Sequence, residues 1–282
     1  MKWSLLHPSA NRSVYGNIVV ADGESLTIRS LTGDAHVGRG ATLTIDAWCC
    51  GNVVIRDGGT LMCGSLLGNI TAGSRVSLTI NGLCSGDVDI DSGGRLECGS
   101  ILGSINAGGH AVLTITRSCG GDVNLESGSF RCAILTGNLC AGPCADLRCD
   151  VACYGDVDIG SGGRFRCNYL TGDMHIGQNA SLTCDGSAYG DVVIDSGGIL
   201  KCNLSLFGDI TNRGGKFEIV GMHRGKISEV RVSKNPKPVA ALVSDATVMC
   251  SICGTSNAKD ASECMACGSD LHAVIKKPNK GI

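Results

Sequence analysis

One stretch of the sequence decides the fold: residues 51–63 read GNVVIRDGGTLMC, and the same pattern returns as GDVDIDSGGRLEC at 86–98, GDVDIGSGGRFRC at 155–167 and GDVVIDSGGILKC at 190–202. The first glycine of each copy belongs to a series of thirteen glycines that recur every 16 to 18 residues. These are Gly16, Gly33, Gly51, Gly68, Gly86, Gly103, Gly121, Gly137, Gly155, Gly172, Gly190, Gly208 and Gly225. A repeat of this length indicates a solenoid, in which each repeat forms one coil and contacts its neighbours.

Apolar residues fall at fixed distances from each of these glycines, at two, four, ten and twelve residues after it and at two before the next one. The alternation of period two inside each short run predicts strands. We therefore expect an all-β fold, a parallel β-solenoid of about twelve triangular coils of 17–18 residues, with three short strands and three corners per coil. Because stacked strands lie about 4.8 Å apart, twelve coils predict a rod about 58 Å long.

The chain is rich in cysteine, with 18 among 282 residues. Eleven of them stand at positions that isoleucine or leucine fills in other coils. They are Cys49, Cys63, Cys84, Cys98, Cys119, Cys132, Cys149, Cys153, Cys167, Cys184 and Cys202. This exchange predicts small buried thiols of the core and weighs against a metal or redox wire. Cys50, Cys140 and Cys144 fall outside these positions, and a surface-thiol or metal role stays open for Cys140 and Cys144.

The remaining four cysteines form a different pattern, in which Cys250 and Cys253 make one CxxC pair and Cys264 and Cys267 make a second. Two residues between cysteines let one tight turn present both thiolates to the same ion, and a glycine follows each pair. Four thiolates around one Zn²⁺ leave no open position, so we predict a structural zinc ribbon with one zinc per chain. A mononuclear iron site and an oxidised pair of thiols are the alternatives.

Domain boundaries follow from where the glycine period starts and stops. We predict an N-terminal tail at 1–15, the β-helix at 16–230, a linker at 231–249 and the zinc ribbon with a basic tail at 250–282. The linker breaks the glycine period and contains two prolines.

Charge changes at the same boundary. Residues 1–230 hold 17 Lys or Arg and 22 Asp or Glu, a net −5, whereas residues 231–282 hold 7 and 4, a net +3. Lys276, Lys277 and Lys280 are available to an anionic surface, although a solvated segment is the simpler interpretation.

The N-terminal stretch MKWSLLHPSANRS has too short an apolar run for a signal peptide, and no run approaches the length of a membrane span. We therefore expect a cytoplasmic protein whose cysteines are thiols or metal ligands. Trp3, Leu5 and Leu6 beside Lys2 offer a small anchor for a membrane surface, and folding onto the first coil as a cap is the equal alternative.

Catalytic motifs are missing from the sequence, so we do not expect an enzyme. His36 and His175 share a position in the repeat but lie eight coils apart, too far to share a metal or a proton. Acids that follow the corner glycines are replaced by asparagine in other coils, which predicts turn residues bonded to the local backbone and weighs against a calcium or pectinase-like site. The GxG strings are corners rather than helix starts, and the charge is near neutral, so we expect neither a nucleotide nor a nucleic-acid ligand.

The two ends of such a rod present unpaired strand edges, which a protein must cap, blunt or use. The last coil offers Phe217, Ile219, Val220 and Met222 near one end. We therefore predict that the protein associates with itself end to end through these residues and forms filaments.

A family resemblance rests on the stretch GNITAGSRVSLTINGLCSGDVDIDSGG at 68–94 and its copies. These resemble the bactofilins, bacterial polymer-forming cytoskeletal proteins, and the G-[DN]-[VI] corner pattern extends over 16–230. The resemblance implies a right-handed triangular β-helix, polymerisation through the terminal coils without nucleotide, and membrane association through a short N-terminal tail at the inner face of the cell membrane. The sequence departs from the family in its twelve coils, its cysteines and its ribbon, which we expect to recruit an unknown protein partner or to regulate assembly.

Two other functions are weighed against this one. A hexapeptide-repeat acyltransferase also has coils of about 18 residues, but the apolar positions here do not recur every six residues. An ice- or carbohydrate-binding solenoid would use an outward ladder such as the threonines eleven residues after the glycine. That ladder is interrupted by charged residues such as Arg131, Arg148 and Arg166.

Overall fold

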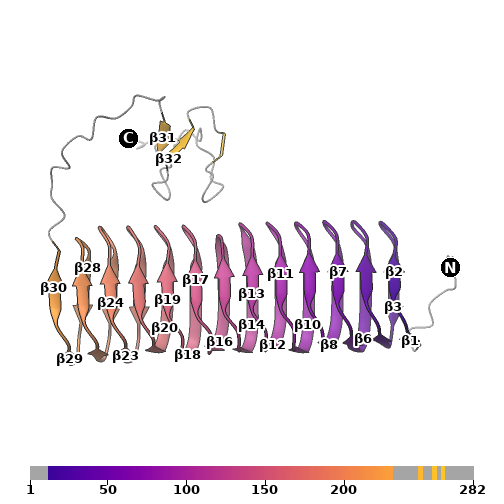
Figure 1. The fold of residues 1–282 in the computed structure, drawn as a ribbon, viewed down its shortest axis with the longest axis horizontal. Coiled ribbons are helices and arrows are strands. Elements are labelled where there is room, and N and C mark those ends of the chain that lie inside the picture. Colours follow the sequence, from indigo (N-terminus) through magenta and orange to yellow (C-terminus); the bar gives the residue numbers. More distant parts are fainter. Residues whose placement is uncertain (1–11, 231–246, 250–255, 259–261, 264–282) are drawn as a thin grey trace, which may run out of the picture.

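The structure is a computed structural model that describes residues 12–230, 247–249, 256–258 and 262–263. Residues 12–230 form a straight rod of stacked coils, and no helix occurs in the described part of the chain (Figure 1). The expected all-β, parallel β-solenoid is therefore confirmed. The four ribbon cysteines, the anchor residues of the N-terminal tail and the lysines at 276–280 lie outside the described residues.

Two parallel sheets run along the rod. The first contains thirteen three-residue strands, one from each coil. These are β2 (Ile18–Val20), β5 (Ala35–Val37), β7 (Val53–Ile55), β9 (Ile70–Ala72), β11 (Val88–Ile90), β13 (Ile105–Ala107), β15 (Val123–Leu125), β17 (Leu139–Ala141), β19 (Val157–Ile159), β21 (Met174–Ile176), β24 (Val192–Ile194), β27 (Ile210–Asn212) and β30 (Ile227–Glu229). Thirteen rungs exceed the expected twelve coils because thirteen glycines bound twelve full intervals, and the strand after Gly225 adds one more rung.

The second sheet is made of seventeen strands that cover the other two sides of the coils. In the middle of the rod these are long: β6 (Thr42–Cys50), β8 (Thr60–Leu66), β10 (Ser77–Cys84), β12 (Arg95–Ile101), β14 (Ala111–Cys119), β16 (Gly128–Leu135), β18 (Asp146–Cys153) and β20 (Arg164–Thr171). Toward the ends they are short: β1 (Ser13–Tyr15), β3 (Ser25–Ile28), β4 (Ser30–Thr32), β22 (Ser181–Cys184), β23 (Ala188–Tyr189), β25 (Ile199–Cys202), β26 (Leu206–Phe207), β28 (Lys216–Ile219) and β29 (His223–Arg224).

The long strands differ from the expected three strands per coil. Each passes the third corner without ending, and its register with the neighbouring strand shifts there, as between Ile45 and Trp48 of β6 or between Ile80 and Leu83 of β10. A shift of this kind is a β-bulge, which bends a strand without breaking it. The expected separate strands occur only near the two ends of the rod.

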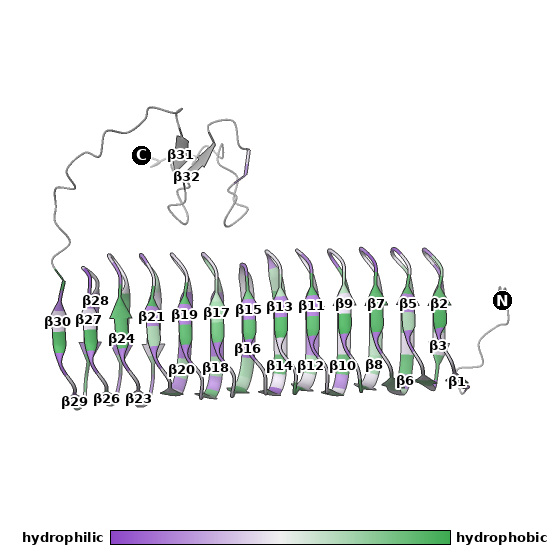
Figure 2. Ribbon diagram, viewed as in Figure 1, coloured by the Kyte–Doolittle hydropathy of each residue, from purple (hydrophilic) through white to green (hydrophobic). Residues whose placement is uncertain are grey.

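The core is a set of inward ladders that run the length of the rod. Figure 2 shows hydrophobic residues recurring in the strands along the rod. The residues expected to point inward are buried, except in the outermost coils, where Ile18, Leu26, Phe217 and Ile219 are half-buried. All eleven cysteines assigned to the core are buried. Burial in an apolar interior raises the pKa of the Cys49 thiol to about 12 and that of the Cys98 thiol to about 11. These cysteines therefore act as small apolar side chains, as the exchange with isoleucine and leucine predicted.

Seven of the thirteen corner glycines, Gly121 among them, have no positive φ and are required by close approach between coils, whereas the other six combine their corner with a positive φ. A Cβ on Gly121 would lie 2.5 Å from the carbonyl carbon and oxygen of Gly103 and 2.6 Å from the nitrogen of Ser104. Seven residues after the corner glycines from Gly16 to Gly190 the chain does turn left-handed, with glycine in some coils and with Arg75, His110, Cys144 or Asn179 in others. From the coil of Gly51 to that of Gly190, glycine and another residue type alternate at this position, so the corners repeat with a period of two coils, a two-coil super-repeat.

A second small element follows the rod in sequence. Strand β31 (Thr247–Met249) pairs antiparallel with β32 (Ser256–Ala258). The segment that connects them contains the first CxxC pair and lies outside the described residues.

Candidate functional site

The N-terminal end of the rod is apolar in every inward position. Its outermost rungs are β1, β2 and β3, and each has a strand partner on one side among the described residues. The inward side chains of these rungs are those of Val14, Ile18, Val20, Leu26 and Ile28. Val14, Ile18 and Leu26 are half-buried and pack against the core. An end of this kind can accept another strand and another apolar rung.

The C-terminal end is mixed in character. Its outermost rungs are β28, β29 and β30, whose inward positions hold Phe217, Ile219, His223, Ile227 and Glu229. Glu229 continues the ladder that is isoleucine, leucine, valine or alanine through most of the rod, and it is exposed. An inward-pointing charge on an edge strand opposes edge-to-edge pairing, because pairing would bury the charge without a partner.

The four predicted self-association residues lie at the C-terminal end, where two of them point inward and two are exposed. Phe217 and Ile219 point inward in β28 and are half-buried against the core. Val220 and Met222 follow β28 and are 65% and 50% exposed. The apolar N-terminal end was not singled out from the sequence, although the inward positions of the first coil could have shown it.

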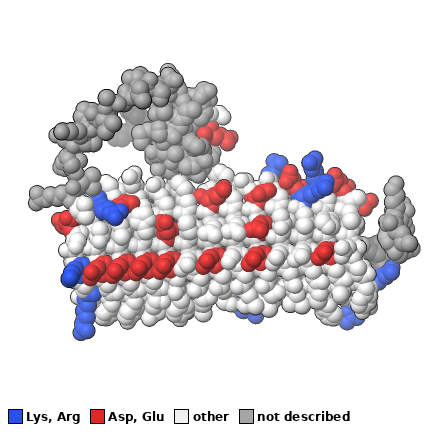
Figure 3. Space-filling model, viewed as in Figure 1, with Lys and Arg blue, Asp and Glu red and all other residues white. Residues whose placement is uncertain are grey.

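A row of acidic side chains follows one corner along the rod (Figure 3), and asparagines stand at the same position in other coils. The side-chain oxygen of each residue accepts a hydrogen bond from the backbone N–H of the equivalent residue one coil later, as from Asp173 N to Asp156 Oδ1 at 2.8 Å and from Asp191 N to Asp173 Oδ1 at 2.8 Å. Asn138 Oδ1 does the same for Asp156 N at 2.9 Å. The expected bonds within the local turn are therefore bonds between coils. Asn and Asp exchange because both carry the required acceptor oxygen.

A histidine joins three successive coils on the outer face of the first sheet. His175 Nδ1 lies 2.8 Å from Asp158 Oδ1, and its Nε2 lies 3.0 Å from Asp195 Oδ2. Arg213 Nη1 lies 3.6 Å from the other oxygen of Asp195. Partial burial lowers the pKa of His175, but hydrogen bonds to Asp195 and Asp158 outweigh this effect and leave the pKa raised. The sequence held a signal for this cluster, since Asp158 and His175 share a repeat position one coil apart.

The three cysteines outside the core positions have separate surroundings. Cys140 is the outward residue of β17 and is exposed, and partial desolvation and the neighbouring Asp158 raise its pKa. Cys144 occupies a left-handed corner position with a φ of 58°. Cys50 ends β6 beside Thr32. In the described part of the chain no three His, Cys, Asp or Glu side chains gather as a metal site.

Comparison with known proteins does not assign a function, so the functional assignment rests on the fold and the surface of the chain. No family model matches the chain, and neither a curated protein nor a solved structure matches it. Within the residues that the structure describes, there is no helix long and apolar enough to cross a membrane.

Proposed function

We propose that this protein is a structural, self-assembling scaffold of the bactofilin type, a right-handed triangular β-helix that assembles end to end without nucleotide. The observation that carries the proposal is the N-terminal end, where five inward positions are apolar and the strand edges have no outer partner among the described residues. Apolar surface and unpaired backbone groups at one place favour association with another copy.

The difference between the two ends decides how copies meet. Placing the C-terminal end of one copy on the N-terminal end of another would press Glu229 against Val20, an apolar and buried residue. Burying an unpaired carboxylate costs several kcal/mol, so this head-to-tail contact is disfavoured. Two N-terminal ends related by a twofold axis place only apolar side chains at the inward positions of the contact. The first assembly product is then a rod of double length, and filaments require the C-terminal ends to meet as well.

Matched variants at the two ends test the proposal. Ile18 and Ile227 occupy the same inward position in the first and the last rung. We expect analytical ultracentrifugation and electron microscopy to detect double rods of the unmodified protein, Ile18→Lys to abolish them and Ile227→Lys to leave them intact. Far-UV circular dichroism checks that both variants fold. A monodisperse monomer at every concentration, or assembly unaffected by Ile18→Lys, would refute the proposal.

The C-terminal segment has a separate role in the proposal. We assign one structural Zn²⁺ to Cys250, Cys253, Cys264 and Cys267, in a ribbon that recruits a protein partner or regulates assembly. The antiparallel pair β31 and β32 supports this assignment, because a hairpin is the usual frame for the turn that carries the first CxxC pair. The double variant Cys250→Ser/Cys253→Ser in the full chain separates the two roles: unchanged assembly points to recruitment and altered assembly to regulation.

The proposal also includes location. Eleven core thiols suit a reducing compartment, which supports a cytoplasmic protein. Trp3, Leu5 and Leu6 would hold it at the inner membrane surface, and co-sedimentation with anionic vesicles, with and without Trp3→Ser, measures that contact.

A further inference from the structure

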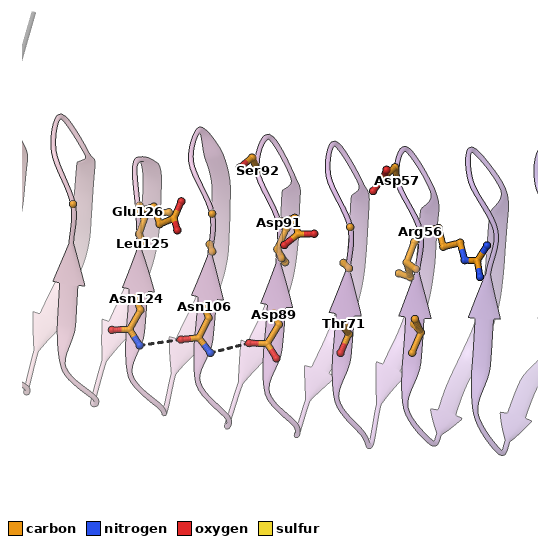
Figure 4. A pocket seen from close by; sticks show the side chains of 18 of the residues that line it. Arg56, Asp57, Thr71, Asp89, Asp91, Ser92, Asn106, Asn124, Leu125 and Glu126 are labelled. Carbon is orange, nitrogen blue, oxygen red and sulfur yellow. Dashed lines mark hydrogen bonds between the residues drawn. The ribbon is translucent and has the colours of Figure 1, made fainter. Parts of the chain in front are cut away.

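A shallow groove of about 880 Å³ runs along the first sheet from the coil of β7 to that of β17. The outward-facing residues of the strands form the floor of the groove, and the residues that directly follow the strands form its wall. Part of the floor is an amide ladder, in which Asn124 Nδ2 donates to Asn106 Oδ1 at 2.9 Å and Asn106 Nδ2 donates to Asp89 Oδ1 at 2.8 Å (Figure 4). The groove therefore has a polar floor whose own hydrogen bonds are partly satisfied.

The wall of the groove follows the two-coil super-repeat. Asp91 follows β11 and Glu126 follows β15, whereas the coils between and beside them have Gly73, Gly108 and Gly142 at this position. Figure 4 shows the two carboxylates on either side of one intervening strand. Both residues are exposed, and among the described residues neither carboxylate is in an ion pair or a hydrogen bond. The wall thus carries two free negative charges with glycine gaps between them.

The spacing of these charges identifies the kind of ligand. Two coils separate Asp91 from Glu126, which is about 9.6 Å along the rod. A polyproline II helix returns to the same side every three residues, about 9.3 Å. An extended, proline-containing segment with lysines three residues apart would therefore place one ammonium group on each carboxylate.

The chain itself contains two segments of this kind, one with Lys234 and Lys237 in the linker and one with Lys277 and Lys280 around Pro278. The length of chain between Val230 and each segment decides which of the two can reach both carboxylates. Glu126 and Asp91 lie six and eight rungs from β30, about 29 and 38 Å along the rod. Lys234 is four residues beyond Val230 and extends at most about 14 Å, so the linker cannot place its two lysines on both carboxylates. The segment 276–280 is separated from Val230 by more than forty residues and has ample length.

We propose that the basic segment Lys276–Lys280 docks in this groove of its own chain, with Lys277 and Lys280 paired to Asp91 and Glu126. Charge complementarity favours the contact, because residues 1–230 carry a net −5 and residues 231–282 carry +3. Arg56, at the same wall position two coils before Asp91, repels a longer basic run and limits the docked segment to the acidic part of the groove. Because the contact is ionic, high ionic strength or an anionic competitor would weaken it.

The test compares tryptic cleavage after Lys276 and Lys280 in the full-length protein at low salt, normalised to a synthetic peptide of residues 271–282. Two exposed ion pairs give modest protection, so we expect Asp91→Asn/Glu126→Gln to speed cleavage by about fivefold. Asp173→Asn/Asp191→Asn removes the same charge from the corner row and keeps its acceptor oxygens, and it should leave the rate unchanged. In 1 M salt, where the Debye length is about 3 Å, the unmodified protein should be cut as fast as the groove variant.

Zero-length carbodiimide cross-linking of a mixture of labelled and unlabelled chains gives an independent measurement. We expect cross-links from Lys277 or Lys280 to Asp91 or Glu126 within one chain. Equal cleavage of the groove variant and the unmodified protein, equal acceleration by the corner-row variant, or cross-links found only between chains or only to other acids would overturn the proposal. None of these results depends on whether the rods assemble through their ends.

Discussion

Replacing a corner glycine tests whether close stacking of coils explains the thirteen-glycine series. In Gly121→Ala the added methyl group would lie 2.5 Å from backbone atoms of Gly103, about 1 Å closer than an ordinary contact. The φ of Gly121 is not left-handed, so the substitution adds no conformational penalty of that kind. The two coils must separate locally, because the opposing atoms belong to backbone that is itself held in the sheet.

The cost follows from the hydrogen bonds that this separation lengthens. Gly120 N donates to Ile101 O and Ile105 N donates to Asp122 O, both at 2.8 Å, and an added 1 Å takes both beyond bonding distance. Two lost bonds cost about 2 kcal/mol, and the loosened packing beside them raises the expected loss to about 3 kcal/mol.

Gly58→Ala is the matched control. Gly58 has a φ of 68°, and its added methyl group would come no closer than 3.9 Å to another residue. Its expected cost is therefore conformational only, about 1 kcal/mol. Urea unfolding followed by far-UV circular dichroism measures both losses, and an unchanged m-value validates the comparison. Equal losses for the two variants, or a loss below about 1 kcal/mol for Gly121→Ala, would refute the stacking explanation.

Three further predictions concern the core, pH and metal. Cys149→Ser should lower the unfolding free energy by about 1–3 kcal/mol because it places a hydroxyl in the apolar interior, whereas exposed Cys140→Ser should not; equal urea midpoints would contradict this. The raised pKa of His175 means that the folded state holds the proton more tightly, so its contribution is full below about pH 6.5 and is lost as pH rises through the folded pKa. Thermal melts across pH should then show the unmodified protein losing its advantage over His175→Gln at high pH, and a constant difference would count against the Asp158–His175–Asp195 cluster. Purified protein should contain about one zinc per chain, and its removal by a chelator should leave the far-UV signal of the rod unchanged; a zinc-free preparation would contradict the ribbon.

Most of the fold could be predicted because a solenoid is a local repeat. Each coil pairs with the coil next to it in the sequence, so the glycine period and the inward positions already state which residues meet. The burial of Cys49 and Cys98 followed from their exchange with leucine and isoleucine at equivalent positions. The number of strands per coil could not be predicted, because a bulge and a corner with a strand break have the same length in sequence.

The surface was harder to predict than the core. The link from His175 to Asp195 joins residues twenty apart, at different repeat positions, and it depends on side-chain direction at a corner. The corner acids were expected to accept hydrogen bonds within their own turns, but they accept them from a backbone N–H of the next coil. Neither outcome follows from residue type alone.

The sequence by itself determined the all-β solenoid, its repeat length and its cysteine-lined core, because those features depend on periodicity and side-chain volume. Only the tertiary structure decided that the corner glycines are needed for close stacking and that Asp91 and Glu126 stand unpaired on one groove. These features arise where coils come together in space, and their distances are set by the stacking of the backbone rather than by the order of residues within one coil.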